Sequence, residues 1–285
     1  MPDRVTVFEV SPRDGLQNEA RTIPTSDKVR LIDMLARSGL TRIEAASFVS
    51  PKWVPQMADG AGVMAGIARP PQVSYAALTP NMTGLQAALG ARVDEVSVFG
   101  AASETFSRRN INASIAESLS RFAPVVSAAR EAGLFVRGYI SCVTDCPFEG
   151  PIAPAAVADV AARLLELGVD EISLGDTIGH GTPATITAML DAVLGICPAE
   201  RLAGHYHDTR DHALANIEVS LSRGLRIFDA SAGGLGGCPY APGAAGNVAT
   251  EAVVDLLEAR GFVTGIDRAR LAEAGTFART LRSMS

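Results

Sequence analysis

The sequence predicts an α/β protein that folds as a (β/α)8 barrel, the TIM barrel. Short β-rich segments alternate with longer segments rich in alanine and leucine along the whole chain. Eight such pairs occur, and no linker, charge run or low-complexity stretch divides them. The length of 285 residues also suits one barrel, which typically takes about 250 residues.

The expected strands are short apolar runs bounded by turn residues. They lie at Val5–Val10, Arg42–Ala46, Val73–Leu78, Glu95–Phe99, Phe135–Ser141, Glu171–Leu174, Leu202–Tyr206 and Arg226–Ala230. Strands that alternate with helices indicate a parallel sheet covered by helices. The first strand runs into Ser11-Pro12-Arg13-Asp14-Gly15, which is no dinucleotide-binding turn, so a closed barrel is favoured over an open doubly wound sheet.

The expected helices show apolar residues at helical spacing. They span Ser26–Ser38, Met82–Leu89, Ile115–Ala132, Ala155–Leu167, Ala184–Leu194, His212–Arg223 and Val248–Arg260. Thr25 or Ser26 is expected to cap the N-terminus of the first helix, which ends at Gly39. Gly168 is expected to end the helix Ala155–Leu167. We expect a single domain over residues 1–285, with the barrel over about 4–260 and a C-terminal helical extension over about 261–285.

Composition excludes several classes of protein. The net charge of −6 argues against nucleic-acid binding, which normally needs a basic face. No apolar run reaches the roughly 18 residues of a membrane span. The N-terminal residues show no signal or transit peptide, so we expect a cytoplasmic protein without membrane contact. The four cysteines are too few for a disulfide scaffold, and we expect most of them to be buried free thiols.

The unusual polar residues fall at the carboxyl ends of the expected strands, where barrels of this type carry their chemistry. They are Arg13 and Asp14 after the first strand, Glu44 near the end of the second, Asp176 after the sixth, His205 and His207 at the end of the seventh, and Cys238 in a glycine-rich loop after the eighth. Strand ends meet around the barrel mouth, so these side chains are expected to converge.

His205 and His207 are the sharpest local signal. Residues two apart on a strand point to the same side, so both imidazoles can face one point. An isolated histidine would more often serve a local hydrogen bond, but two of only four in the chain share this face, which favours metal ligation. With Asp14 they suit Mg²⁺ or Mn²⁺, and zinc stays possible. Asn247 can add an amide oxygen or cap the helix that follows it.

The other polar residues have two interpretations each. Arg13, Glu44 and Asp176 can form structural ion pairs at the rim of the barrel. Arg13 can instead neutralise an enolate oxygen, because a guanidinium donates two parallel hydrogen bonds. Cys238 can be a packed thiol or a proton donor on a mobile loop, since a free thiol is mostly protonated at neutral pH.

Longer motifs carry a resemblance to a known family. They are Ser11-Pro12-Arg13-Asp14-Gly15-Leu16-Gln17-Asn18-Glu19, Ser47-Phe48-Val49-Ser50-Pro51-Lys52-Trp53-Val54-Pro55-Gln56-Met57, Phe99-Gly100-Ala101-Ala102-Ser103-Glu104, Ser173-Leu174-Gly175-Asp176-Thr177-Ile178-Gly179, Gly236-Gly237-Cys238-Pro239-Tyr240-Ala241-Pro242-Gly243 and Gly246-Asn247-Val248-Ala249-Thr250-Glu251. With them the chain resembles the 3-hydroxy-3-methylglutaryl-CoA (HMG-CoA) lyase family over nearly its whole length. Arg-Asp and His-x-His alone would also fit isopropylmalate synthase, homocitrate synthase and hydroxy-oxovalerate aldolase, and the Cys238 loop narrows the resemblance to the lyase.

The resemblance implies a retro-Claisen cleavage of HMG-CoA to acetyl-CoA and acetoacetate, a homodimer, and a role in leucine breakdown or ketone-body formation. Carried over residue by residue, the ligands of the divalent cation (Mg²⁺ or Mn²⁺) are Asp14, His205, His207 and Asn247. Arg13 would stabilise the thioester enolate, and Cys238 would transfer a proton. Glu44 and Asp176 would join the polar network around metal and substrate. The base stays open between Asp14 and a relay linked to the metal.

The acyl-CoA substrate needs cationic contacts, and Arg108, Arg109 and Asn110 after the fourth strand are expected to meet the CoA phosphates, although paired arginines are often only solvated.

Two departures from the family pattern lie near the expected metal site. Arg210-Asp211 stands where Tyr-Gly is usual, and His180 where a small or apolar residue is expected. An enzyme for a related branched 3-hydroxy-acyl-CoA is therefore an alternative.

Two further alternatives are weaker. An acetyl-CoA-condensing synthase of the same superfamily would often carry a regulatory domain after the barrel, and the chain ends too soon after the eighth strand to hold one. A non-catalytic barrel used for binding should have lost a metal ligand or Cys238, and none of them is missing.

Overall fold

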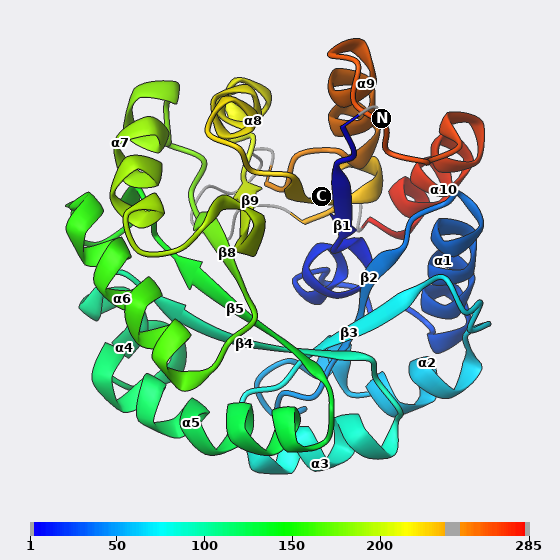
Figure 1. Ribbon diagram of the computed structural model, residues 1–285. Helices are drawn as coiled ribbons and strands as arrows, with labels where there is room; N and C mark the ends of the chain where they lie inside the picture. The colour runs from blue at the N-terminus through cyan, green and yellow to red at the C-terminus, as the bar shows by residue number, and fades with distance from the viewer. Residues whose placement is uncertain (1–2, 237–245, 283–285) are drawn as a thin grey trace.

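Eight parallel strands close into a barrel, in the order β1-β10-β9-β8-β5-β4-β3-β2. The structure is a computed structural model that describes residues 3–236 and 246–282. Figure 1 shows the strands in the centre and the helices arranged around them. The predicted (β/α)8 barrel is confirmed.

Each strand of the barrel overlaps a predicted one. They are β1 (Thr6–Glu9), β2 (Arg42–Ser47), β3 (Ser74–Leu78), β4 (Glu95–Ala101), β5 (Phe135–Ser141), β8 (Glu171–Asp176), β9 (Leu202–Tyr206) and β10 (Ile227–Ala230). Strands β5 and β9 have the predicted bounds. Strands β2, β4 and β8 run further toward the mouth than predicted, because their last residues are small or polar and carry no β-branched signal.

The helices of the described residues are α1 (Thr25–Arg37), α2 (Gly60–Gly66), α3 (Met82–Gly90), α4 (Glu104–Ile111), α5 (Ile115–Glu131), α6 (Pro154–Leu167), α7 (Pro183–Leu194), α8 (Ala213–Ser222), α9 (Thr250–Ala259) and α10 (Arg268–Leu281). The sequence prediction missed α2, which is short and glycine-rich, and α4, which is mostly polar. It also missed the hairpin of β6 (Asp145–Cys146) and β7 (Gly150–Pro151). Within the described part of the chain, no helix has the length and apolar character needed to cross a membrane.

The predicted cap of α1 is wrong. Pro24 occupies the cap position and no side chain accepts a hydrogen bond there. The Thr25 hydroxyl instead donates to Asp59 Oδ2 at 2.7 Å. The predicted end points are confirmed, since Gly39 (φ 98°) follows α1 and Gly168 (φ 97°) follows α6 in the left-handed conformation that glycine adopts without strain.

The main apolar core lies between the barrel and its helices. Outward-facing strand residues such as Ile43, Val96 and Ile172 belong to one cluster with the inner helix residues Leu31 and Leu164. Side chains alternate along a strand, so the neighbours of these apolar residues point into the barrel. A separate small cluster of Phe8, Val10 and Ala76 lies apart from this layer.

Buried ion pairs fill much of the barrel interior. Arg42 pairs with Glu95 at 2.5 Å and with Glu171 at 2.7 Å. Arg137 pairs with Glu171 at 2.8 Å and with Asp229 at 2.6 Å. The parallel register sets Arg137 directly beside Glu171. An unpaired charge here would cost several kcal/mol, so each interior charge depends on its partner.

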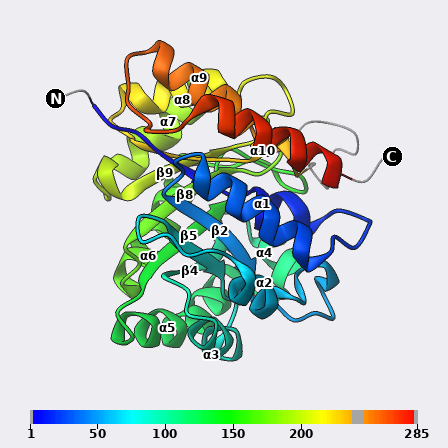
Figure 2. The same cartoon turned by 90° about the vertical axis from the view of Figure 1, so that its right-hand side faces the viewer.

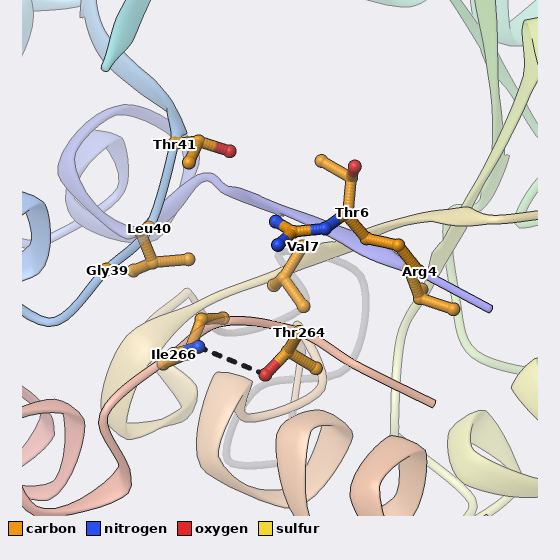
Figure 3. A pocket seen from close by; sticks show the side chains of 9 residues that line it. Arg4, Thr6, Val7, Gly39, Leu40, Thr41, Thr264 and Ile266 are labelled. Atoms are coloured by element: carbon orange, nitrogen blue, oxygen red, sulfur yellow. Dashed lines mark hydrogen bonds between the residues drawn. The ribbon is translucent and has the colours of Figure 1, made fainter. Parts of the chain in front are cut away.

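The end of the barrel opposite the mouth contains a small cavity. The start of β1, the segment 39–41 and the segment 264–266 meet there around a cavity of about 10 Å³ (Figure 3). Ile266 N donates to Thr264 Oγ1 at 3.2 Å within this contact. The cavity has room for about one water molecule and not for a substrate.

The predicted C-terminal extension contains α10. This helix packs along α1, as Figure 2 shows, and against the turn Ala232–Gly234 after β10. Asp267 caps it by accepting hydrogen bonds from Ala269 N and Arg270 N at 3.0 and 3.1 Å. Helix α10 therefore supports, from outside the barrel, the start of the glycine-rich loop.

Gly15 is the point where the turn after β1 (Ser11–Gly15) meets the turn after β10. A Cβ atom at Gly15 would lie 2.9 Å from both Leu235 Cβ and Ser231 Oγ. We predict that Gly15→Ala lowers the free energy of unfolding by about 1–3 kcal/mol, because the two turns must separate. Urea denaturation followed by circular dichroism measures this change. Gly90→Ala is the control, since nothing lies within 4 Å of its Cβ position, and equal losses in both variants would contradict the prediction.

Candidate metal centre

The turn after β1 and the end of β9 bring Asp14, His205 and His207 together. Their potential ligand atoms all lie within 4.8 Å of one another. The two imidazole centroids are 5.5 Å apart. We call these three side chains the metal triad. Two imidazoles and a carboxylate at this spacing can share one divalent cation.

The strand period explains how β9 presents both histidines. His205 and His207 point to the interior side, while Tyr206 between them points outward and its hydroxyl hydrogen-bonds Ser220 Oγ on α8 at 2.7 Å. His207 also forms an isolated bridge with Asn247, which follows the glycine-rich loop. The end of β9 is therefore held from the helix side and from the side of the loop.

Asp14 is held by two donors. Arg13 Nη1 donates to Oδ1 and Asn247 Nδ2 donates to Oδ2, both at 2.7 Å. Burial alone would raise the pKa of Asp14, but the charges of Arg13, His205 and His207 and the Asn247 hydrogen bond lower it to about 2. Asp14 is therefore ionised at neutral pH, as a metal ligand must be.

Asn247 does not cap the helix that follows it. The cap position of α9 is Ala249, and the Asn247 amide nitrogen instead donates to Asp14 and, at 3.3 Å, to the Leu235 carbonyl. The capping interpretation is wrong. With the nitrogen engaged twice, the amide oxygen is the atom that Asn247 can offer to a cation.

The surroundings shift the pKa values of the two histidines in opposite directions. Burial and the neighbouring His205 lower the pKa of His207 to about 4, against weaker opposing effects of Asp14 and the Thr177 backbone. Burial also lowers the pKa of His205, but Asp229 and Asp14 outweigh it and the net shift is upward. His207 is therefore neutral at pH 7, the form that binds metals.

Arg13 lies between two carboxylates. Its Nε and Nη2 contact Glu44 Oε2, each at 2.6 Å, while Nη1 contacts Asp14. Glu44 is fully buried and also accepts from the Tyr139 hydroxyl at 3.2 Å. Burial raises the pKa of Glu44 despite the nearby Arg13. The two carboxylates fix Arg13 beside the metal triad, and Glu44 acts through Arg13.

The contacts of Asp176 lead away from the metal triad. Its oxygens accept from Thr144 Oγ1 at 3.1 Å, His180 N at 3.2 Å and Gly181 N at 2.9 Å. On β8 the side chain of Ser173 points inward, where it donates to Asp229, so Asp176 falls on the outward face. Among the described residues, these hydrogen bonds of Asp176 hold the loop after β8, and none of them joins it to the metal triad.

Arg108, Arg109 and Asn110 lie exposed on α4, which follows the mouth end of β4. Arg108 Nε is 3.9 Å from Glu104, and the Arg109 guanidinium lies 4.1 Å from the centre of the Phe148 ring. These contacts do not join Arg108 or Arg109 to the metal triad.

A groove of about 290 Å³ lies at the same end, between the segment after Asp14 and the segment after β2. Gln17, Asn18 and Trp53 line part of it, and the Trp53 side chain is 78% exposed. Gln56 ties the two segments together, since its amide nitrogen donates to the Arg21 carbonyl and its oxygen accepts from Ile23 N. The groove offers room for ligand parts remote from a cation.

The residues of the two departures from the family pattern are not members of the metal triad. Asp211 is exposed and adopts a positive φ of 58°, which explains why glycine suits this position and why aspartate is tolerated. Arg210 beside it is exposed as well. His180 donates its backbone N–H to Asp176.

Sequence reasoning missed the polar groups beneath the metal triad. His205 Nδ1 is 3.0 Å from Asp229 Oδ2, and Arg137 Nη2 is 2.6 Å from Asp229 Oδ1. The Tyr139 ring stands edge-on to His205, with centroids 6.1 Å apart. A signal was present, because Arg137 and Asp229 are charged residues inside apolar strand runs, where a buried charge needs a partner.

The cysteines follow the prediction where they are described. Cys142, Cys146 and Cys197 are buried free thiols. Cys238 lies outside the described residues. Gly236, two residues earlier, is described and lies against Asn247, since a Cβ at Gly236 would be 2.7 Å from Asn247 Nδ2.

Known proteins resemble this chain along almost its whole length. The family model described as HMGL-like matches residues 4–277. A Gallus gallus protein named "Hydroxymethylglutaryl-CoA lyase, mitochondrial" is 58% identical, over 97% of this chain and 93% of its own. The chain belongs to the HMG-CoA lyase family. A member from Pseudomonas aeruginosa, named "3-hydroxy-3-isohexenylglutaryl-CoA/hydroxy-methylglutaryl-CoA lyase", is 56% identical over 96% of this chain and 92% of its own.

A solved structure of this family has the same fold. The crystal structure of the HMG-CoA lyase from Brucella melitensis superposes with a TM-score of 0.97 and 59% identity, over 98% of this chain and 99% of that chain. The family resemblance predicted from the sequence motifs is therefore confirmed, and the enzyme class of this family, carbon–carbon lyase, applies to the chain.

We predict that His207→Ala weakens Mn²⁺ binding by about tenfold or more, because it removes one of three converging donors. Isothermal titration calorimetry measures the affinity. His180→Ala is the control, since His180 lies near the same mouth outside the metal triad and should bind Mn²⁺ like the unaltered protein. An unchanged affinity of the His207 variant would show that this imidazole is not a ligand.

Proposed function

We propose that this protein is a divalent-metal-dependent lyase that cleaves HMG-CoA to acetyl-CoA and acetoacetate by a retro-Claisen reaction. The observation that carries the proposal is the metal triad beside Arg13 at the barrel mouth. The identity to proteins named hydroxymethylglutaryl-CoA lyase supports HMG-CoA as the substrate. The relative that is 58% identical is named for HMG-CoA alone, so a related branched 3-hydroxy-acyl-CoA is not favoured.

The proposed ligands are Asp14, His205 and His207, with the amide oxygen of Asn247 as a further donor. An ionised carboxylate, a neutral imidazole and an amide oxygen fit a hard divalent cation, so we propose Mg²⁺ or Mn²⁺, with zinc as the alternative. When bound, the cation supplies a Lewis acid that lowers the pKa of the substrate's tertiary hydroxyl.

Arg13 is placed to stabilise the enolate left on acetyl-CoA after the C2–C3 bond breaks. A guanidinium has five N–H donors, and the contacts with Glu44 and Asp14 use one each of Nε, Nη1 and Nη2. The second N–H groups of Nη1 and Nη2 can donate to an oxyanion. Glu44 supports this step by holding the guanidinium in one orientation.

The low pKa of Asp14 bears on its role. A carboxylate with a pKa of about 2 is a weak proton acceptor at neutral pH. This favours Asp14 as a ligand over Asp14 as the base that removes the hydroxyl proton. We propose Cys238 as the donor of the proton that quenches the enolate, which its place after Gly236 supports.

The remaining assignments concern binding and biology. We propose that the CoA phosphates contact Arg108, Arg109 and Asn110, because these exposed groups lie at the mouth end of the barrel. The homodimer, the cytoplasmic location and the part in leucine degradation stay predictions from the sequence and its resemblance.

Purified protein with Mg²⁺ or Mn²⁺ should convert HMG-CoA to equal amounts of acetyl-CoA and acetoacetate, measured by liquid chromatography. We predict that Asp14→Asn lowers turnover by about two orders of magnitude or more, because it removes the negative charge from the cation site. Asp211→Asn makes the same chemical change on an exposed side chain and should leave turnover unchanged.

Two results would contradict these expectations. Failure to cleave HMG-CoA with any of Mg²⁺, Mn²⁺ and Zn²⁺, while a longer-branched homologue is cleaved, would overturn the substrate. Substantial turnover in the Asp14 variant would remove this carboxylate from the reaction.

A further inference from the structure

Asp229 is a buried carboxylate that the proposed reaction does not use. It lies on β10 and is 2% exposed. Its Oδ2 is 3.0 Å from His205 Nδ1 and 2.9 Å from Ser173 Oγ, while Oδ1 is 2.6 Å from Arg137 Nη2. Both carboxylate oxygens are therefore engaged, and one of their partners is a member of the metal triad.

The fold fixes this contact. The register of β9 and β10 places Asp229 directly beside His205, and both side chains point into the barrel. Arg137 on β5 reaches Asp229 with two nitrogens, Nη1 at 3.2 Å and Nη2 at 2.6 Å. This two-point contact prevents the carboxylate from rotating away from the imidazole.

The charge of Asp229 is also defined. The Arg137 guanidinium is permanently charged and donates to both oxygens of Asp229, which pairs the carboxylate with it as the anion. Asp229 is therefore ionised at neutral pH and can only accept hydrogen bonds. His205 Nδ1 must then carry the hydrogen in this contact.

A neutral imidazole has one N–H and one lone pair. With the hydrogen on Nδ1, the lone pair lies on Nε2, the nitrogen that Asp229 does not contact. Nε2 is therefore the atom that His205 can offer to a cation shared with Asp14 and His207. The opposite tautomer would present an N–H to the cation.

We infer that Asp229 is a positioning residue of the metal centre, which orients His205 and selects the tautomer that leaves Nε2 free to bind the cation. Arg137 supports it by holding the carboxylate in place. The inference rests on the proposed metal centre and adds to it a residue outside the metal triad. A carboxylate that accepts from a ligating histidine typically changes metal affinity by about 10–100-fold.

Asp229→Asn tests the inference with little change in shape. The variant amide can keep its oxygen on Arg137 and turn its NH₂ group toward His205 Nδ1. That nitrogen must then accept, which moves the imidazole hydrogen to Nε2. We predict a loss of Mn²⁺ affinity of about 10–100-fold, measured by calorimetry or by the electron paramagnetic resonance of free Mn²⁺.

Glu171→Gln is the matched control. Glu171 is 3% exposed and pairs with the same Arg137 at 2.8 Å, so the substitution removes a buried carboxylate from the same guanidinium. The structure shows its ion pairs with Arg137 and Arg42, and no described contact of Glu171 reaches His205. We expect this variant to lose thermal stability comparably while binding Mn²⁺ like the unaltered protein.

The tautomer can be determined in the unaltered protein, without a variant at Asp229. ¹⁵N chemical shifts of His205 in the metal-free protein, assigned with His205→Gln, should show hydrogen on Nδ1 and a lone pair on Nε2 for its neutral form. The opposite tautomer in the unaltered protein would overturn the inference even if the Asp229 variant failed to fold.

The Mn²⁺-binding measurements distinguish the role of Asp229 from the metal centre on which that role rests. Undiminished Mn²⁺ affinity in Asp229→Asn, or an equal loss in Glu171→Gln, would overturn the role of Asp229. Failure of the unaltered protein to bind Mn²⁺ would instead overturn the metal centre itself. A selective loss in the Asp229 variant supports both.

Discussion

A buried ion pair inside the barrel holds the metal triad in position. Arg137 pairs with Asp229, and Asp229 contacts His205 at 3.0 Å. Such interiors are usually filled by branched apolar side chains, whereas paired charges fill much of this one. Removing one member of a buried pair typically costs about 3–5 kcal/mol, because its partner is left charged and dry. The paired charges of the interior therefore limit the conformations that the side chains at the barrel mouth can adopt.

Most of the fold could be predicted from the spacing of apolar residues, because every strand and helix must turn an apolar side toward the layer between barrel and helices. Strands β5 and β9 have the predicted bounds, and the predicted end of α6 at Gly168 is confirmed. Two general rules were enough to bring His205, His207 and Asp14 together: alternation along a strand, and the position of active sites at the strand ends. Helices α2 and α4 lacked an apolar stripe and were missed.

The other parts of the site depend on register and facing, which one strand alone does not reveal. The predicted strand ended at Leu174 and left Asp176 in a loop facing the mouth. Two more strand residues turn Asp176 to the outer face, where it holds His180 and Gly181. Asp229 was missed because its contact with His205 requires β9 and β10 to be paired in one particular register.

The claim on which the account depends is that the metal triad shares one cation. Anomalous diffraction from a crystal soaked in Mn²⁺, collected at the manganese absorption edge, tests it directly. The account predicts one strong peak within bonding distance of Asp14, His205 Nε2 and His207. Well-ordered triad side chains without a peak between them, at a Mn²⁺ concentration that saturates binding in solution, would contradict it.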